Sequence, residues 1–428
     1  MIGPTVLGAF REPRYRWLWC SNVAGSAGRW GLVLVLSAQL LQVTHSSFWV
    51  GLGLFLTQGP VVLVAPFSGM LADRFDRRAL NVGAVSVSAV VTGLFALLTW
   101  LGLLTLPAML ALSLLFGMSF VFQMTLRSTL VASLVPRDGI LNAVSLFQVG
   151  TQGAQFLGPI LATPLLATRG PAPAWLLCSL LYGTAAVLST RVGEARGLGR
   201  PEEHRESIAA RLAGALHYLR LRPLAWTAIV AVTLHCALTM AYQGMLPMFV
   251  SMDLGADTSS YGVLLTAIGM GAVAGSLVLA RLDGERYRPA LFAVSLVGSG
   301  LGLAVLGLAP SPRVAYVAGF VAGGTQAMFM SATLALIQSS VGNEFRGRAT
   351  SLYQMITLTP MAVFGWGMGG LADIMEPRPL MVAGGALFLV AMAVYGWRSP
   401  WLRGLFREDG WRPGDAAWSR PVAPAIGE

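Results

Sequence analysis

The chain has 428 residues, of which 55% are hydrophobic and only 11% are charged. A soluble protein of this length usually carries about a quarter charged residues. With a mean hydropathy of +0.67, so much apolar surface could not be covered in water, which excludes an ordinary soluble protein. Repeated apolar runs of about 20 residues instead predict an all-α membrane protein.

The net charge of +10 could suggest binding to nucleic acid, but the distribution of the charge argues against it. All 29 basic residues are arginines, and they are spread over many short loops without forming one stripe. We therefore expect no nucleic-acid partner. Basic loops on the inner side of a lipid bilayer explain the pattern better.

Twelve apolar segments are candidates for membrane-spanning helices. Each except the short sixth is long enough to cross a hydrocarbon core of about 30 Å at about 1.5 Å rise per residue. The predicted spans are 17–42, 48–72, 79–101, 106–126, 140–167, 173–190, 224–249, 259–280, 289–309, 313–338, 348–372 and 380–397.

The arginines also predict an orientation. With the N-terminus inside the cell, 25 of the 29 arginines fall in inner segments, Arg127 among them at the inner end of the fourth span. Arg169, Arg313 and Arg378 fall in outer loops, and Arg29 lies within the first span. The opposite orientation would invert this bias. We expect a multi-pass protein of a bacterial-type inner membrane, with both termini in the cytoplasm.

A long polar loop divides the spans into two halves of six. Apolar residues recur at helical spacing from Ile208 to Leu219, which predicts an amphipathic helix on the inner membrane surface. The predicted organisation is an N-terminal six-helix bundle at 1–190, a cytoplasmic linker at 191–223, a C-terminal six-helix bundle at 224–405 and a disordered cytoplasmic tail at 406–428.

The two halves repeat weakly. Residues Ala143 to Gln148 read AVSLFQ at the start of span five, and Ala349 to Gln354 read ATSLYQ at the start of span eleven. Two six-helix halves in parallel repeat are typical of many secondary transporters. The sequence thus predicts twelve transmembrane helices in two pseudo-repeat bundles.

The densest charge cluster reads GMLADRFDRR, from Gly69 to Arg78. Two carboxylates and three arginines between two apolar runs must lie at a membrane surface. Gly69 removes a side chain where two helices approach closely. Asp73, at a helix end, can accept backbone N–H bonds or pair with an arginine.

GMLADRFDRR resembles the signature G-x-L-a-D-R-x-x-R-R of the major facilitator superfamily. The stretches FREPRYRWLW, SNVAGSAGRW and FRGRATSLYQ resemble the branch that holds bacterial siderophore and macrolide exporters, the transmembrane secretion effectors. The resemblance runs from about residue 10 to 405. It implies a transporter that alternates between two conformations, and it implies export. Coupling to protons rests on this resemblance alone.

The resemblance also implies a conformational latch, formed by Gly69, Asp73, Arg74, Arg77 and Arg78. Asp73 and Arg77 would close the cytoplasmic side, while Arg74 and Arg78 would hold lipid phosphates or neighbouring carboxylates. The alternative is a charge cluster that only anchors the loop. A partial copy of the motif ends at Asp373, which we expect at the outer end of span eleven, paired with Arg378.

Polar side chains inside a bilayer are costly, so each is a candidate site residue. In the superfamily, helices one, four, seven and ten line the central cavity, and polar faces fall on these four helices here. The predicted cavity residues are Asn22, Arg29, Gln123, His235, Tyr242 and Gln326. The alternative for each of them is a structural role in helix packing.

No carboxylate lies near the middle of any span. His235 is the one mid-membrane group that titrates near neutral pH, and so it is the predicted coupling residue for a proton. Arg29 has no carboxylate partner in the sequence pattern. It therefore favours an anionic or polar small-molecule substrate that could neutralise it.

Enzyme and metal chemistry find no support. The chain has no P-loop, no HExxH and no GxSxG, so we expect neither an enzyme nor a cofactor. Cys20, Cys178 and Cys236 lie in apolar segments without a CxxC pattern, so we expect small buried side chains and no metal site. We also expect a monomer.

The sequence thus predicts a secondary active exporter of a small amphiphilic or anionic molecule, of the drug or siderophore class. An importer or facilitator of a small metabolite stays open, because the same fold performs both tasks. A non-transporting membrane scaffold or receptor is the third reading. The direction of flux in vesicles separates the first two, and a stable partner complex without any flux favours the third.

Overall fold

Helices form every regular element in the part of the chain that the structure describes. The computed structural model describes residues 8–135, 139–193, 214, 216–282, 286–341 and 346–407. The first group of helices comprises η1 (Gly8–Arg11), α1 (Pro13–Thr44), α2 (Ser47–Gln58), α3 (Val61–Arg74), α4 (Arg77–Trp100), α5 (Leu106–Leu134), α6 (Ile140–Arg169) and α7 (Pro171–Thr190). The second comprises α9 (Pro223–Leu238), η3 (Ala241–Gly244), α10 (Leu246–Met248), η4 (Phe249–Asp253), α11 (Thr258–Arg281), α12 (Arg288–Gly307), α13 (Pro312–Ser339), α14 (Arg346–Ala372), α15 (Pro377–Arg398) and α16 (Pro400–Gly404).

The predicted all-α membrane fold is confirmed. Ten helical segments among the described residues are long and apolar enough to cross a membrane. The helices α1 and α6 are not among these ten, but with 32 and 30 residues they exceed the length of about 20 that a span requires. Together these segments account for all twelve predicted spans.

Two of the spans are interrupted, which the apolar pattern does not predict. The second span breaks at Gly59 and Pro60, because proline has no N–H to donate and its ring disrupts the helix. As a result α2 ends at Gln58 and α3 begins at Val61. The seventh span ends its regular helix at Leu238 and continues through η3, α10 and η4. Both breaks lie where the two halves of the molecule meet.

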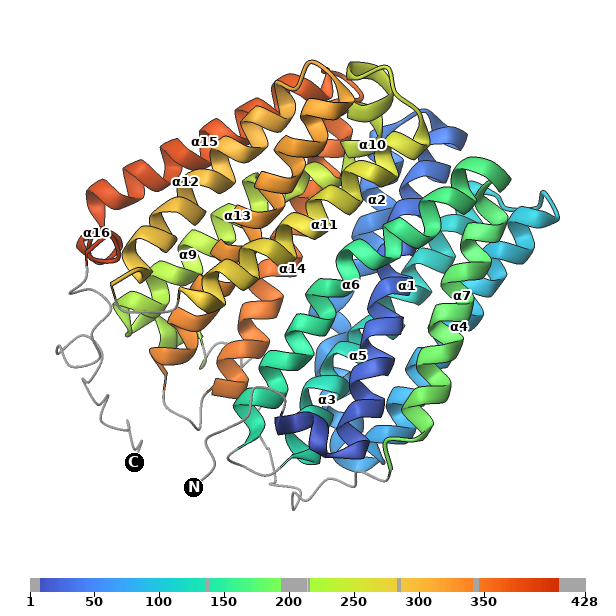
Figure 1. Ribbon diagram of the computed structural model, residues 1–428, viewed down its shortest axis with the longest axis horizontal. Coiled ribbons are helices and arrows are strands. Elements are labelled where there is room, and N and C mark those ends of the chain that lie inside the picture. Colours follow the sequence, from blue (N-terminus) through green and yellow to red (C-terminus); the bar gives the residue numbers. More distant parts are fainter. Residues whose placement is uncertain are drawn as a thin grey trace.

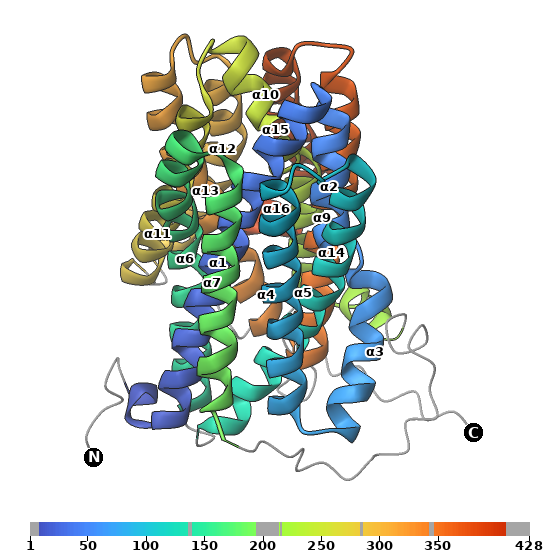
Figure 2. The same cartoon turned by 90° about the vertical axis from the view of Figure 1, so that its right-hand side faces the viewer.

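Helices α1–α7, the N-terminal half, lie beside α9–α16, the C-terminal half (Figure 1). Within the N-terminal half α1 packs on α6 and α7, and within the C-terminal half α13 packs on α11 and α12. The halves meet mainly through α2 against α14 and α6 against α11. Figure 2 shows α10 near one end of the molecule and α3 near the other.

Several predictions concern residues outside the described part. The amphipathic helix predicted from Ile208 to Leu219 lies largely in residues 194–213, and the predicted tail lies largely in 408–428, which are both outside it. Of the cysteines, Cys178 and Cys236 are buried as expected, whereas Cys20 is exposed on α1. The expectation of a buried side chain at Cys20 was therefore wrong.

Candidate transport site and the closure between the halves

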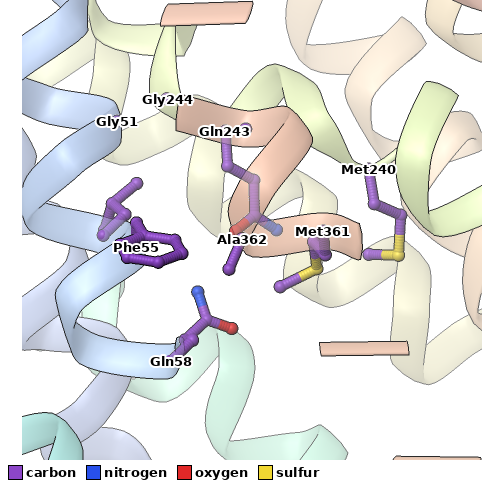
Figure 3. Close-up of a pocket in the computed structure, with 10 residues that line it drawn as sticks. Gly51, Phe55, Gln58, Met240, Gln243, Gly244, Met361 and Ala362 are labelled. Atoms are coloured by element: carbon purple, nitrogen blue, oxygen red, sulfur yellow. The ribbon is translucent and has the colours of Figure 1, made fainter. Parts of the chain in front are cut away.

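A pocket lies between the two halves, at the level of the two helix breaks (Figure 3). Three elements contribute to it: α2, the segment around η3, and α14. The lining residues are Gly51, Leu54, Phe55, Gln58, Met240, Gln243, Gly244, Met361, Ala362 and Gly365. A site built from both halves is what a transporter with alternating access requires, because the bound molecule must be reachable from each side in turn.

The lining combines two amides with apolar walls. Figure 3 shows the side chains of Gln58 and Gln243 directed toward the same space, with Met361 beside them. Methionine is unbranched and polarisable, so it adapts to irregular apolar ligands. A few polar groups in a mainly apolar lining is the usual composition of a small-molecule site. The lining thus has the composition of a site for an amphiphilic molecule, while the cavity of about 10 Å³ leaves room for no more than about one water molecule in this closed conformation.

Arg29 is connected to this pocket through Gln58. Its Nη2 donates a hydrogen bond of 3.1 Å to Gln58 Oε1. Its guanidinium carbon also lies 4.1 Å from the ring centroid of Phe120 on α5, a cation–π contact. Among the described residues, no carboxylate forms an ion pair with Arg29. The positive charge at the edge of the pocket thus contacts an amide and an aromatic ring, and no described carboxylate neutralises it.

Arg127 belongs to the interior of the N-terminal half. Its position in the sequence places it among the inner-surface arginines, but its side chain is only 7% exposed. Its Nη1 donates to Asn22 Oδ1 at 3.3 Å, and Asn22 Nδ2 donates to Thr151 Oγ1 at 2.8 Å. Arg127 therefore does not act as a topogenic surface charge. The structure joins it to Asn22 on the same face of α1 that carries Arg29.

Gln123 faces a neighbouring helix of its own half. Its Nε2 donates to Ser88 Oγ on α4 at 2.8 Å, and the side chain is buried. This contact is an interhelical hydrogen bond of the kind that holds membrane helices together. The predicted cavity role of Gln123 stays a prediction, and its observed partner is α4.

The three predicted site residues of the C-terminal half gather around Thr239. The His235 Nδ1 lies 2.7 Å from Thr239 Oγ1, and Gln326 Nε2 donates to the Thr239 carbonyl oxygen at 3.0 Å. The His235 ring packs on Phe329 and Phe388, with centroid separations of 4.7 and 5.6 Å. Tyr242 is buried in η3, one turn further along the chain. His235 and Gln326 thus form one polar cluster, separate from Arg29.

The structure therefore divides the six predicted cavity residues into two groups and one separate residue. Asn22 and Arg29 lie on α1, while His235, Tyr242 and Gln326 lie around the break after α9. The separate residue is Gln123, which bonds to Ser88 on α4. Sequence reasoning missed Gln58 and Gln243, which line the pocket itself. The signal that could have found Gln58 is its position directly before Gly59 and Pro60, since broken membrane helices frequently mark binding sites.

The predicted latch is only partly described. At Gly69, Asp73 and Arg74 the structure describes only the helical backbone of α3. Asp76 accepts a hydrogen bond of 3.0 Å from the Arg78 backbone N–H and so caps the start of α4. The Arg78 side chain donates to the Thr190 carbonyl oxygen at the end of α7. This part of the motif therefore ties α4 to α7 within one half, and the latch itself stays a prediction.

A carboxylate of the C-terminal half contacts the first residues of α2, at the end of that helix away from Gln58. Asp373, directly after α14, accepts hydrogen bonds from the backbone N–H of Ser47 at 2.6 Å and of Phe48 at 3.2 Å, and from the Ser46 hydroxyl. The first N–H groups of a helix have no partner within the helix and carry partial positive charge. Asp373 therefore caps α2 from the other half of the molecule.

Arg378 does not pair with Asp373, contrary to expectation. Its Nε lies 3.5 Å from Asp253 Oδ1, and its Nη2 donates to the Asp253 carbonyl oxygen at 3.3 Å. Burial of Asp253 raises the pKa of its carboxyl, and the Arg378 charge opposes that rise. Arg378 thus connects α15 to η4 within the C-terminal half. The observed hydrogen bonds of Asp373 go to the start of α2.

Glycines bring the two halves into backbone contact beside this cap. A Cβ on Gly51 of α2 would lie 2.9 Å from the Trp366 Cα and 3.0 Å from the Gly365 carbonyl oxygen, both on α14. A Cβ on Gly244 of η3 would lie 3.1 Å from the Gly51 Cα of the other half. A Cβ on Gly369 would overlap the Ser47 carbonyl oxygen. We call this set of contacts, with the Asp373 cap, the α2–α14 closure. It excludes side chains and seals the pocket at this end.

Two helical halves with a pocket between them, closed against each other at one end, define a transporter of the major facilitator type. The family described as transmembrane secretion effector matches residues 4–405, and the chain belongs to this family. The family prediction from the sequence is thereby confirmed.

Known relatives are exporters by name. The chain is 26% identical over 369 residues to the enterobactin exporter EntS of Citrobacter koseri, covering 84% of this chain and 86% of the relative. It is 27% identical over 374 residues to the enterobactin exporter EntS of Salmonella typhimurium, with coverage of 84% and 86%.

Solved structures show the same fold. A bacterial homologue of the human lysosomal transporter Spinster, inward-facing and unoccupied, aligns with a TM-score of 0.69 at 15% identity, covering 94% of this chain and 99% of that one. A POT family transporter in complex with a thioalcohol-conjugated peptide aligns with a TM-score of 0.71 at 12% identity, covering 91% and 96%. At these identities the likeness concerns the fold alone.

A substitution at Gly369 tests whether close packing holds the α2–α14 closure together. Gly369→Ala places a methyl group against the Ser47 carbonyl oxygen, so it should favour the conformation in which this end opens. Overpacking of this kind costs about 1–3 kcal/mol. The matched control is Gly367→Ala on the same helix, where a Cβ would meet nothing within 4 Å.

The reporter for this test is a cysteine at buried Ser47, with Cys20 replaced by serine. The rate of its reaction with a thiol reagent should rise several-fold in Gly369→Ala and stay unchanged in Gly367→Ala. Equal rates in the two variants would show that the contact does not hold the closure.

Proposed function

We propose that this protein exports a small amphiphilic anion across the bacterial inner membrane by alternating access. The observation that carries the proposal is the charge of Arg29, which lies beside the pocket between the halves and is linked to it by Gln58. No described carboxylate neutralises this charge. A ligand with an acidic group would supply the missing partner, and the apolar pocket wall would accept its hydrophobic part.

The relatives support export and suggest a substrate class. Proteins that match this chain over most of its length are named enterobactin exporters. We propose a siderophore or a similar acidic aromatic molecule as the cargo. Phe55 and Phe120, one in the pocket and one stacked on Arg29, offer rings against which such a molecule could pack.

We further propose that the α2–α14 closure lies on the outer side of the membrane. This orientation rests on the arginine distribution, which places the N-terminus and the Gly69–Arg78 cluster inside. Since α2 begins at the outer end in that orientation, the structure is closed to the outside. Export then requires the α2–α14 closure to open while the Gly69–Arg78 end closes.

The substitution Arg29→Gln tests the anion preference. It removes the charge but keeps a polar side chain, so uptake of enterobactin into inside-out vesicles should fall about tenfold or more, in line with about 1.5–3 kcal/mol for a hydrogen bond to a charged group. Transport of a neutral amphiphile should change little. The matched control is Arg313→Gln, in the predicted outer loop. Equal transport of the anion by wild type and Arg29→Gln would refute the anion role.

His235 is our proposed coupling residue. It is fully buried between two phenylalanines, and its Nε2 has no hydrogen-bond partner among the described residues. A proton on this ring would place a charge in an apolar core, so protonation should favour a rearrangement around Thr239 and Gln326. This sensitivity is what coupling to a proton gradient requires.

The variant His235→Gln keeps a polar side chain but cannot carry a charge. We expect it to bind substrate normally and to lose the acceleration of export by an imposed pH gradient. Thr239→Val, which removes the hydroxyl beside the ring and keeps the histidine, is the control for local packing. If the pH gradient drives His235→Gln as well as wild type, protons are not coupled through this residue.

The latch at the cytoplasmic end has its own test. Asp73→Asn removes the charge that would accept backbone N–H bonds when this end closes. Transport should slow while the affinity for substrate stays nearly unchanged, because Asp73 is not among the residues that line the pocket. Loss of binding with normal turnover kinetics would contradict the latch.

A further inference from the structure

The Arg127 guanidinium is the least satisfied charged group in the described interior. Its side chain is 93% buried, as its exposure is 7%. Only Nη1 has a partner, the Asn22 side chain, while Nε and Nη2 are buried and donate to nothing among the described residues. A guanidinium is always charged and carries five N–H donors in a rigid fork. Most of that donor capacity is unused here.

An unpaired buried charge is expensive, and its surroundings do not offset it. Burial of a charge without a partner costs several kcal/mol in a protein interior. Among the described residues no carboxylate forms an ion pair with Arg127. Arg29, which lies on α1 one turn beyond Gly25, is also positively charged. Among the described residues, this region therefore holds two cations and no carboxylate paired with either.

The fit around Arg127 is close on its α1 side. A Cβ on Gly25 would lie 2.9 Å from Arg127 Nη2, so any larger residue at this point of α1 would require the guanidinium to shift. Three residues later, a Cβ on Gly28 would lie 3.0 Å from the Tyr182 ring of α7. The Ser26 hydroxyl, on the same face, donates to Asn22 Oδ1 at 3.5 Å. Guanidinium, amide and hydroxyl thus converge at the crossing of α1 and α5.

We propose that Arg127 forms an anion-binding site, distinct from the pocket between the halves, in which Nε–H and Nη2–H hold one small anion. These two N–H groups point in parallel from the edge of the guanidinium, an arrangement that matches a carboxylate bidentately and also serves a halide. The anion is an acidic group of the transported molecule or a free inorganic anion, and the two sources share this chemistry. Because Asn22 already occupies Nη1, the site takes a single anion.

The test measures thermal stability and needs no transport, so its result is independent of the proposed export. Purified protein in a neutral detergent is melted while chloride or acetate replaces gluconate at constant ionic strength. Ligand binding to the native state raises the midpoint by mass action. We expect the wild-type midpoint to rise by a few degrees and the Arg127→Gln midpoint to stay constant.

The matched control for charge is Arg313→Gln, at an exposed position in the first turn of α13, which should keep the wild-type response. If Arg127→Gln does not fold, Gly25→Ala replaces it, since the added methyl group pushes the guanidinium aside. Its control is Gly183→Ala on α7, where a Cβ meets nothing within 4 Å.

The two probes separate the sources of the anion. A response to acetate alone assigns the site to an acidic group of the cargo, and a response to chloride assigns it to a free inorganic anion. Either response, when lost in Arg127→Gln, supports the site. No response of the wild type to either anion, or an equal response in Arg127→Gln, would overturn the proposal.

Discussion

Backbone contact between α2 and α14 holds the two halves of the molecule together beside the pocket. Glycines at the crossing let the two helices touch without side chains between them, and Asp373 completes the contact by capping α2 from the other half. The cap is a charge-assisted interaction with an end of a helix, so it can be released as a unit when the halves rotate apart. The position of the pocket follows from it, because Gly51, Gly244 and Gly365 belong both to the closure and to the pocket lining.

Unbalanced positive charge is the second organising feature. Arg29 lies on α1, and Arg127 reaches the same face of α1 from α5. No described carboxylate pairs with either. A helical bundle in lipid tolerates such charges where a ligand or water can complete their hydrogen bonds. The proposals for the cargo and for the anion site both follow from this imbalance. They differ in place: Arg29 reaches the pocket through Gln58, whereas Arg127 lies against Gly25 and Asn22.

Much of this organisation was predictable from the sequence, since apolar runs and loop arginines depend on the bilayer alone. The face of α1 that carries Asn22 and Arg29 also followed from helical periodicity. Periodicity does not say which neighbour a face meets, so Gln123, which bonds to Ser88 on α4, could not be placed. Periodicity also could not reveal that Asp373 caps α2, which lies more than 300 residues before it in the chain. A cap between the two halves leaves no local pattern in the sequence.

Alternating access means that the two ends of the molecule open in turn, and distances between spin labels can follow both ends. One label pair is placed at Val43 and Ile374, both exposed beside the α2–α14 closure, and the other at the exposed residues Ser133 and Ser339 near the far ends of α5 and α13. When Gly369→Ala is introduced into the protein in lipid nanodiscs, we expect a longer distance for the first pair and a shorter one for the second, in equal fractions of the molecules. If both distances stay fixed, or both lengthen together, alternating access through this closure is contradicted.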